Sequence, residues 1–439
     1  MTSKTNNFPN PIFRTLFLLI TFILLNSGKA ISQEEKKEIP DGTEGIYFVV
    51  PAVDSVTGKP IHPPSNEWEN YWSTFKIGLG FVYDFATYSQ DDIARQQNDS
   101  LGISVGPTFK LRDLRFNASG RVKSERTLAW KFAFTYDGVT GKWLMRETGI
   151  TIGVPELAGH IFIGRTKEGY SMIKTMNGYS ILGLERQMAL DVIPIFGDGI
   201  KWYGYLPKSR IFWSMGAFND AIGYKQSYST FAWSYSTRIG WMPFYNEEKN
   251  KLIHMAMSFR YAKPENKKIT LSSRPESNPS PTFISTGEFT ADHSNHIGGE
   301  VYYSSGPFLI GSEVNLHNFT SKTVEDHSFF GGDFVLSYIF TGSNHPYNTV
   351  GSIYTFVPVK KAVLKGGWGE WEGVLRFSSL NLNDGSIQGG QFWRITPMIN
   401  WYLSKTTRIE FIYGYGVLDR FNLKGTTQFF ESRLQIFAF

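Results

Sequence analysis

Two basic side chains in one long irregular segment, Lys174 and Arg186, are the clearest candidates for chemistry in this sequence. The segment covers residues 164–186 and has a basic front half, in a chain that otherwise alternates apolar and polar residues. An arginine can hold a phosphate through a bidentate fork, whereas a lysine acts as a point charge. In a narrow, partly desolvated passage such cations would favour anions and oppose cations. The alternative is that both are ordinary solvated loop charges.

Two other patterns could carry chemistry, and neither has the context it requires. Residues 102–106 match the G-x-S-x-G pattern of serine hydrolases, with Ser104 at the nucleophile position. That motif needs a strand–turn–helix elbow, and no helical period follows it here. The 8 histidines are scattered without metal-ligand spacing, and there is no cysteine. We therefore expect no metal site and no cofactor.

The elements that would position these residues are β-strands. From residue 74 to the end, apolar and polar residues alternate in sixteen candidate strands; in one of them Trp233, Ile239 and Trp241 lie opposite Arg238. Most run about 10–14 residues, near the length of a tilted membrane-spanning strand, whereas soluble strands average about 5–6. Aromatic residues make up 16% of the chain and dominate the apolar faces. We predict an all-β fold, a transmembrane antiparallel β-barrel of about sixteen strands.

The N-terminus carries an export pattern. Lys4 and Arg14 precede an apolar run over residues 15–25, and small residues occupy positions 28 and 30. This predicts a signal peptide over residues 1–30, cleaved after Ala30. Residues 31–72 are polar and rich in Glu and Pro, so we expect an irregular periplasmic lead-in before an outer-membrane barrel over residues 73–439. Without residues 1–30 the charges nearly balance, which gives no indication of a nucleic-acid partner.

The lengths of the connections alternate as well. Connections after odd-numbered strands are the longer ones: 85–102, 167–198, 220–228, 263–294, 319–327, 381–389 and 419–426. Those after even-numbered strands are short, apart from residues 341–365. Long outer loops and short periplasmic turns are typical of outer-membrane barrels. Because loops as long as residues 167–198 are usually functional, we expect this one to fold into the lumen and constrict it.

The last strand has two competing registers. Phe439 and Phe437 are terminal aromatic residues on one face, while Leu434, Ile436 and Ala438 form an apolar set on the other. One extra residue in a strand exchanges its two faces. We therefore expect a bulge near residues 436–437.

The chain resembles the phosphate-selective porins, the O and P porins, in two places. Residues 164–165 (Gly-Arg) and 184–186 (Leu-Glu-Arg) bound a segment of the length of that family's constriction loop. Residues 341–342 (Thr-Gly), followed by residues 346–347 (Pro-Tyr), resemble its long periplasmic connection. The resemblance implies a sixteen-stranded homotrimer in outer-membrane lipid that admits small anions such as phosphate by passive diffusion.

The same resemblance implies roles for individual residues. Lys174 is similar to the loop lysine that binds an anion at the narrowest point, and Arg186 to an arginine at the loop's end. Glu147 is similar in position to the acid that pairs with that lysine. Lys110 and Arg112 lie near the family's paired arginines, and Arg165 opens the loop.

One departure from the family concerns two loop serines, which are replaced by Asn177 and Gly178. The replacement removes hydroxyl donors suited to phosphate, so strict phosphate selectivity stays open.

Strand parity directs further basic residues into the lumen, among them Lys131, Arg238 and Arg260. Charges on a lumen wall could tune ion selectivity, or they could form a purely structural lattice with the acids opposite them. Two other functions stay open, a non-selective general porin and a barrel-borne outer-membrane enzyme that uses Ser104.

Overall fold

The computed structural model describes residues 66–438, apart from residues 101, 139 and 223–230. The predicted signal peptide and most of the predicted lead-in lie outside the described residues, as does Phe439. Within the lead-in, β1 (Glu67–Glu69) pairs with the first barrel strand. None of the helices in the described residues is both long and apolar enough to cross a membrane.

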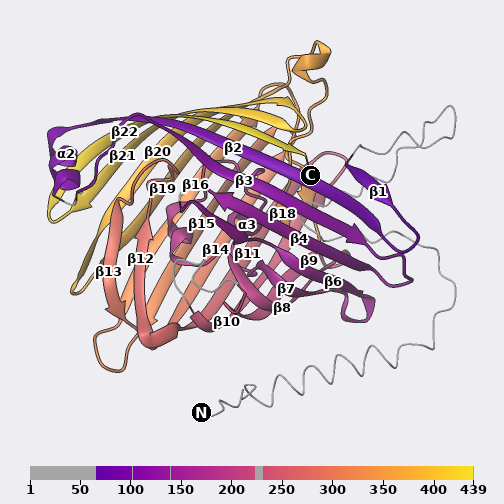
Figure 1. The fold of residues 1–439 in the computed structure, drawn as a ribbon, viewed down its shortest axis with the longest axis horizontal. Helices are drawn as coiled ribbons and strands as arrows, with labels where there is room; N and C mark the ends of the chain where they lie inside the picture. Colours follow the sequence, from indigo (N-terminus) through magenta and orange to yellow (C-terminus); the bar gives the residue numbers. More distant parts are fainter. Residues whose placement is uncertain (1–65, 101, 139, 223–230, 439) are drawn as a thin grey trace, which may run out of the picture. The chain divides into compact units, whose positions relative to one another are not determined.

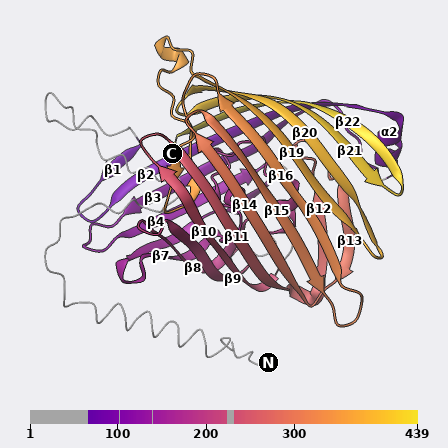
Figure 2. The same cartoon turned by 180° about the vertical axis from the view of Figure 1, so that it is seen from behind.

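The described residues form a closed antiparallel β-barrel of sixteen strands, as predicted. β5 and β6 count as one strand because both pair with β4, and the pairing of β2 with β22 closes the barrel (Figure 1). Figure 2 shows the same wall from behind. The barrel strands are β2 (Thr74–Gln90), β3 (Thr108–Arg121), β4 (Leu128–Asp137), β5 (Lys142–Met145) with β6 (Thr148–Val154), β7 (Gly159–Lys167), β8 (Phe196–Leu206), β9 (Ile211–Asn219), β10 (Phe231–Asn246), β11 (Lys251–Pro264), β14 (His293–Ser305), β15 (Phe308–Thr320), β16 (His327–Ile339), β19 (Glu370–Asp384), β20 (Ile387–Ser404), β21 (Thr407–Arg420) and β22 (Leu423–Ala438).

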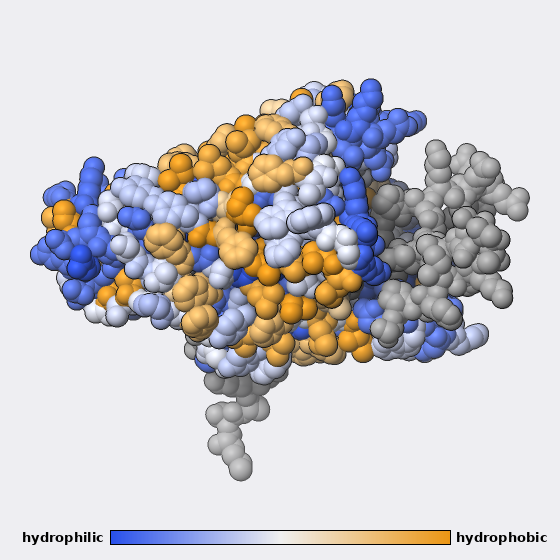
Figure 3. All heavy atoms as spheres, turned by 90° about the horizontal axis from the view of Figure 1, so that it is seen from above, coloured by the Kyte–Doolittle hydropathy of each residue, from blue (hydrophilic) through white to orange (hydrophobic). Residues whose placement is uncertain are grey.

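Alternation along each strand separates a lipid face from a lumen face. On β10, Ile239 and Trp241 are each 50% exposed, while Arg238, directly before Ile239, is fully buried. Large apolar side chains are exposed on nearly every barrel strand. Figure 3 shows them as an orange zone over the middle of the barrel with hydrophilic residues toward its two ends. This is the pattern of a barrel wall in contact with lipid.

One end of the barrel has short turns and the other has longer insertions. The short-turn end includes residues 122–127, 207–210, 247–250, 306–307, 405–406 and η1 (Pro155–Leu157). The opposite end carries α2 (Asp92–Asp99), residues 168–195, and an extension built on β12 (Lys268–Ser273) and β13 (Ile284–Thr290) after η3 (Glu265–Lys267). By the rule for outer-membrane barrels the short-turn end faces the periplasm.

Two connections expected to be long are tight turns. β19 and β20 are joined by residues 385–386, and β21 and β22 by residues 421–422. The pairing extends through residues expected to be loops, because Asn383 pairs with Gln388 and Arg420 pairs with Leu423. Gly385 and Asn422 have positive φ, which suits such tight reversals.

The expected bulge near residues 436–437 is absent. β22 pairs with β2 in continuous register from Thr427 to Ala438. Ile436 faces outward and is 44% exposed. Phe437 faces inward, where its ring lies 4.8 Å from Phe356 and 5.5 Å from Tyr179. No change of register is needed to place Phe437, because its ring packs against aromatic residues inside the barrel.

The core of the protein lies inside the barrel rather than in a separate layer. Three segments contribute to it: residues 168–195 with α3 (Met172–Thr175) and η2 (Met188–Val192), residues 265–292, and residues 340–369. The last of these contains β17 (Tyr347–Asn348), β18 (Ile353–Tyr354) and η4 (Val363–Lys365). Their apolar side chains pack with inward-facing residues such as Phe329, Leu380 and Phe392.

We predict that a charge on the lipid face destabilises the barrel according to its depth. Ile239→Arg, at the middle of β10, should cost about 2–4 kcal/mol, because a cation at the bilayer midplane is poorly solvated. Tyr303→Arg, two residues from the periplasmic end of β14, should cost about 0–1 kcal/mol. Urea unfolding of vesicle-inserted protein, followed by tryptophan fluorescence, measures both. Equal costs at the two positions would contradict this assignment of the lipid face.

Candidate pore constriction

The loop of residues 168–195 crosses the lumen and bonds to strands on several sides. Its Tyr170 hydroxyl donates to Asn315 Oδ1 at 3.0 Å, and the Ile173 amide donates to Glu313 Oε1 at 2.9 Å, both on β15. Farther along, the Tyr179 hydroxyl donates to Asp113 Oδ1 on β3 at 2.7 Å. Gln435 on β22 donates to the Tyr179 carbonyl at 3.0 Å. This loop, which we call the inner loop, therefore has the position predicted for a constriction loop.

The extension between β11 and β14 also enters the lumen. Glu276, near its tip, lies 3.2 Å from the Arg376 guanidinium on β19 and accepts a hydrogen bond from Ser378 at 2.5 Å. Arg394 on β20 donates to the Pro275 carbonyl at 2.5 Å. The sequence predicted only a long outer loop here, because its polar tip gives no sign of the inward course.

Residues 340–369 enter the lumen from the periplasmic end. Arg238 on β10 donates to the Ser352 hydroxyl at 2.6 Å and to the Ser352 carbonyl at 3.0 Å. The Tyr347 hydroxyl lies 2.7 Å from His254 Nδ1 on β11. This explains why a connection at the short-turn end is so long: it helps to fill the barrel.

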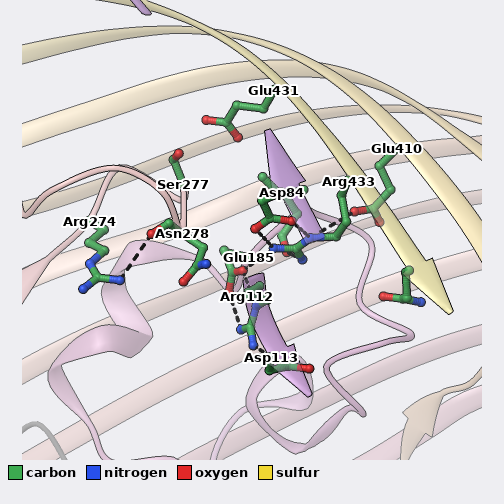
Figure 4. Close-up of polar contacts among 12 residues, drawn as sticks. Asp84, Arg112, Asp113, Glu185, Arg274, Ser277, Asn278, Glu410, Glu431 and Arg433 are labelled. Atoms are coloured by element: carbon green, nitrogen blue, oxygen red, sulfur yellow. Dashed lines mark hydrogen bonds and ion pairs between the residues drawn. The ribbon is translucent and has the colours of Figure 1, made fainter. Parts of the chain in front are cut away.

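The end of the inner loop is held by a chain of alternating charges (Figure 4). Glu185 accepts from Arg112 at 2.7 and 2.8 Å and from Arg433 at 2.6 Å. Arg433 also donates to both oxygens of Asp84, at 2.6 and 2.7 Å, and Arg112 pairs with Asp113. Burial opposes ionisation of Glu185, but the two guanidinium groups hold the pKa of its carboxyl well below its usual range. The loop is thereby fixed to β2, β3 and β22.

Lys174 does not face an open passage. Its side chain is fully buried, and its ammonium donates to the carbonyls of Ile193 at 2.5 Å and Leu190 at 3.4 Å within the inner loop. Burial lowers the pKa of this ammonium well below its usual value. The structure therefore does not place Lys174 at the open constriction where it was expected. The inner loop folds back and encloses its own lysine.

Arg165 and Glu147 also have partners other than an anion or Lys174. Arg165 is buried and donates to Asp198 Oδ1 at 2.8 Å. Glu147 accepts from Lys131 at 2.8 Å, so the acid that the resemblance paired with the loop lysine pairs with a wall lysine.

The other three expected residues lie where water reaches the inner wall. Lys110, Arg112 and Arg186 are each partly exposed. Arg112 pairs with Glu185, and Arg186 donates to the carbonyls of Ile173 at 3.1 Å and Met176 at 2.9 Å. Among the described residues Lys110 forms no ion pair. These cations lie on β3 and on the inner loop beside it.

The alternation pattern of the sequence did not identify a fourth cation of this group, Arg146. It lies between the end of β5 at Met145 and the start of β6 at Thr148, where the strand is interrupted. The interruption breaks the alternation, so strand parity could not place its side chain. Arg146 is partly exposed, its guanidinium carbon lies 5.2 Å from the centre of the Phe196 ring, and it forms no ion pair with another described residue. The sequence signal that could have identified Arg146 is its position directly before Glu147, which was already a candidate site residue.

The lumen-facing arginines predicted from parity are buried and paired. Arg238 contacts Glu300 at 2.5 Å, and Arg260 contacts Glu168 of the inner loop at 2.5 Å. On this side of the barrel the wall charges are largely neutralised. Among the inward-facing cations of the described residues, Lys110 and Arg146 near β3–β6 form no ion pair.

The two other sequence patterns that could carry chemistry can be located in the described residues. Ser104 lies in the connection between α2 and β3, so no strand–turn–helix elbow surrounds it. In the part of the chain that the structure describes, no three His, Asp or Glu side chains converge as a metal site.

Comparison with known proteins agrees with this geometry. Residues 75–434 match the family model described as phosphate-selective porin O and P. No curated protein matches the sequence significantly.

Similar solved structures are outer-membrane proteins. An anion-selective porin from Comamonas acidovorans is 11% identical with a TM-score of 0.52, and the match covers 83% of this chain and 100% of that chain. The outer membrane channel DcaP of Acinetobacter baumannii is 9% identical with a TM-score of 0.52, covering 84% and 99%. The trimer form of in-vitro folded OmpT from Vibrio cholerae is 10% identical with a TM-score of 0.51, covering 83% and 99%. At these identities the likeness is one of fold.

The family match spans most of the barrel, and the closed wall, the lipid face and the lumen-crossing loop are those of an outer-membrane channel. The chain belongs to the phosphate-selective porin O and P family and is an outer-membrane β-barrel.

Proposed function

We propose that this outer-membrane porin favours small anions, phosphate-like ones included, over cations. The observation that carries the proposal is the partly exposed basic group formed by Lys110, Arg112, Arg146 and Arg186. Cations beside a water-filled passage raise the local concentration of anions and lower that of cations.

The neighbouring acids do not cancel this group. Glu185 is shared between Arg112 and Arg433, and Glu147 is paired with Lys131. Each acid is thus engaged with a base, while Arg146 and Lys110 have no carboxylate partner among the described residues. We infer that these two cations make the accessible region favourable to anions.

The filled lumen argues for a narrow passage along β3–β6. The inner loop, residues 265–292 and residues 340–369 bury many inward side chains of the other strands. On β3, β5 and the β5–β6 break, by contrast, charged and apolar inward residues are only partly buried, among them Lys110, Leu144 and Arg146. We expect a small single-channel conductance.

A homotrimer is part of the proposal. It is supported by the family and by the trimer form of the similar Vibrio cholerae structure. Native mass spectrometry of the detergent-extracted protein would test it, and a monomer alone would contradict it.

We predict that Arg146→Gln weakens the preference for chloride over potassium. A cation that interacts with a passing ion by about 1 kcal/mol alters the permeability ratio by about fivefold. Lys174→Met is the matched control, since the Lys174 ammonium is enclosed by the inner loop. Reversal potentials across a KCl gradient in planar bilayers measure both. A shift in the control alone, or in neither variant, would contradict the assignment of the passage.

We also predict saturable block of the chloride current by inorganic phosphate. Arg146→Lys keeps the charge but loses the bidentate fork, so it should weaken the block by about tenfold and leave the chloride preference nearly unchanged. Single-channel recordings with increasing phosphate give both values. Lack of any saturable block in the unmodified protein would identify a general porin instead.

A further inference from the structure

Residues 360–369, which we call the periplasmic knob, project from the short-turn end of the barrel. Figure 1 shows this orange segment, with the coil of η4, standing out from the end where the C-terminus lies. Leu364 is 99% exposed and Trp368 is 83% exposed. Lys360, Lys361 and Lys365 are exposed beside them. Such a combination of large apolar and basic side chains on a surface marks an interaction site.

The periplasmic knob has a defined backbone conformation. Backbone hydrogen bonds close it on itself: the amide of Gly367 donates to the Ala362 carbonyl at 3.0 Å, and the amide of Gly366 donates to the Val363 carbonyl at 2.9 Å. Gly366 and Gly369 have positive φ, which allows the two reversals. At its base, Val357 and Val359 pack with Ile339 and Tyr402 in a small core.

Two tryptophans of the lipid face bind the periplasmic knob directly. The rings of Trp371 on β19 and Trp401 on β20 are stacked, with centres 4.8 Å apart. Their indole N–H groups both donate to the Trp368 carbonyl, at 3.2 and 2.9 Å. Tryptophans of a barrel gather at the level of the lipid headgroups. The exposed side chains of the periplasmic knob are therefore continuous with the membrane interface.

The periplasmic knob carries positive charge that no acid of the described residues pairs with. None of Lys360, Lys361 and Lys365 forms an ion pair with another described residue. Glu370, the nearest acid in sequence, is buried and accepts from Thr341 and from the Lys360 amide. Lys360 Nζ donates to the Gly342 carbonyl at 3.4 Å. The complementary ligand is anionic.

We propose that the periplasmic knob binds anionic phospholipid headgroups of the periplasmic leaflet. Leu364 and Trp368 enter the interface, and the three lysines contact the phosphate groups of the lipids around β19 and β20. Basic residues near an anionic membrane surface and apolar residues at the acyl boundary reinforce each other in this way. The site is separate from the passage along β3–β6, and its occupancy does not depend on which ions the channel prefers.

The absence of cysteine from the chain allows a single-site test with the full mature protein. Leu364→Cys, labelled with an apolar fluorophore, is reconstituted in vesicles of phosphatidylcholine and phosphatidylglycerol in which either lipid is brominated. We expect brominated phosphatidylglycerol to quench more than brominated phosphatidylcholine at equal mole fraction. A label on Leu423→Cys, at the opposite end of the barrel, should show no such preference.

Charge variants separate a specific site from general attraction. In the labelled background, Lys360→Gln, Lys361→Gln and Lys365→Gln together should abolish the preference, since each lysine contributes about fivefold to anionic-lipid affinity. The matched control is Lys208→Gln, Lys249→Gln and Lys251→Gln, three exposed lysines at other periplasmic turns, which should retain it. Equal quenching by the two lipids, quenching by neither, or equal losses in both triple variants would each overturn the proposal. Heat-modifiable migration on gels verifies that every variant is folded.

Discussion

The constraint on which the rest of this structure depends is the absence of water in the membrane. Each backbone N–H and C=O in contact with lipid needs a protein partner, so the ladder must close on itself. The pairing of β2 with β22 supplies that closure, in one register from Gln90 to Leu79. Once the wall is closed, strand alternation assigns every side chain to lipid or lumen. A bulge near residues 436–437 would have exchanged the faces of the last strand beyond it and moved Phe437 out of the lumen.

Closure also moves the hydrophobic core to an unusual place. The lumen of this barrel contains a packed apolar cluster contributed by the inner loop, the extension from β12 and β13, and the periplasmic segment. Charges that are wholly or partly buried surround that cluster, and they are arranged in pairs and chains such as Asp84–Arg433–Glu185–Arg112. A charge buried without a partner is strongly destabilising. The chain of ion pairs therefore offsets the cost of burying these charges, and it also fixes the inner loop to the wall.

This packing changes what a basic residue in the lumen can do. Arg238, Arg260 and Lys174 are satisfied by carboxylates or carbonyls, and they build the plug. Lys110, Arg112 and Arg146 near β3–β6 are only partly buried, and Arg146 lies beside the Phe196 ring and forms no ion pair with another described residue. Under the proposed function, the few charges that packing leaves accessible would set the ion selectivity, whereas most lumen charges stabilise the fold.

By itself the sequence determined the architecture. The alternation of apolar and polar residues is a local property, and in each strand it decides which side chains face lipid and which face the lumen. The sixteen strands, the lipid face and the inner loop all follow from period-two patterning and connection length. Only the tertiary structure decided which charges are available. Lys174 is enclosed because its own loop folds back on it, Glu147 meets Lys131 across neighbouring strands, and Arg146 turns inward at an interruption between β5 and β6. Those outcomes depend on contacts between distant residues and on strand irregularities, which a periodic pattern does not encode.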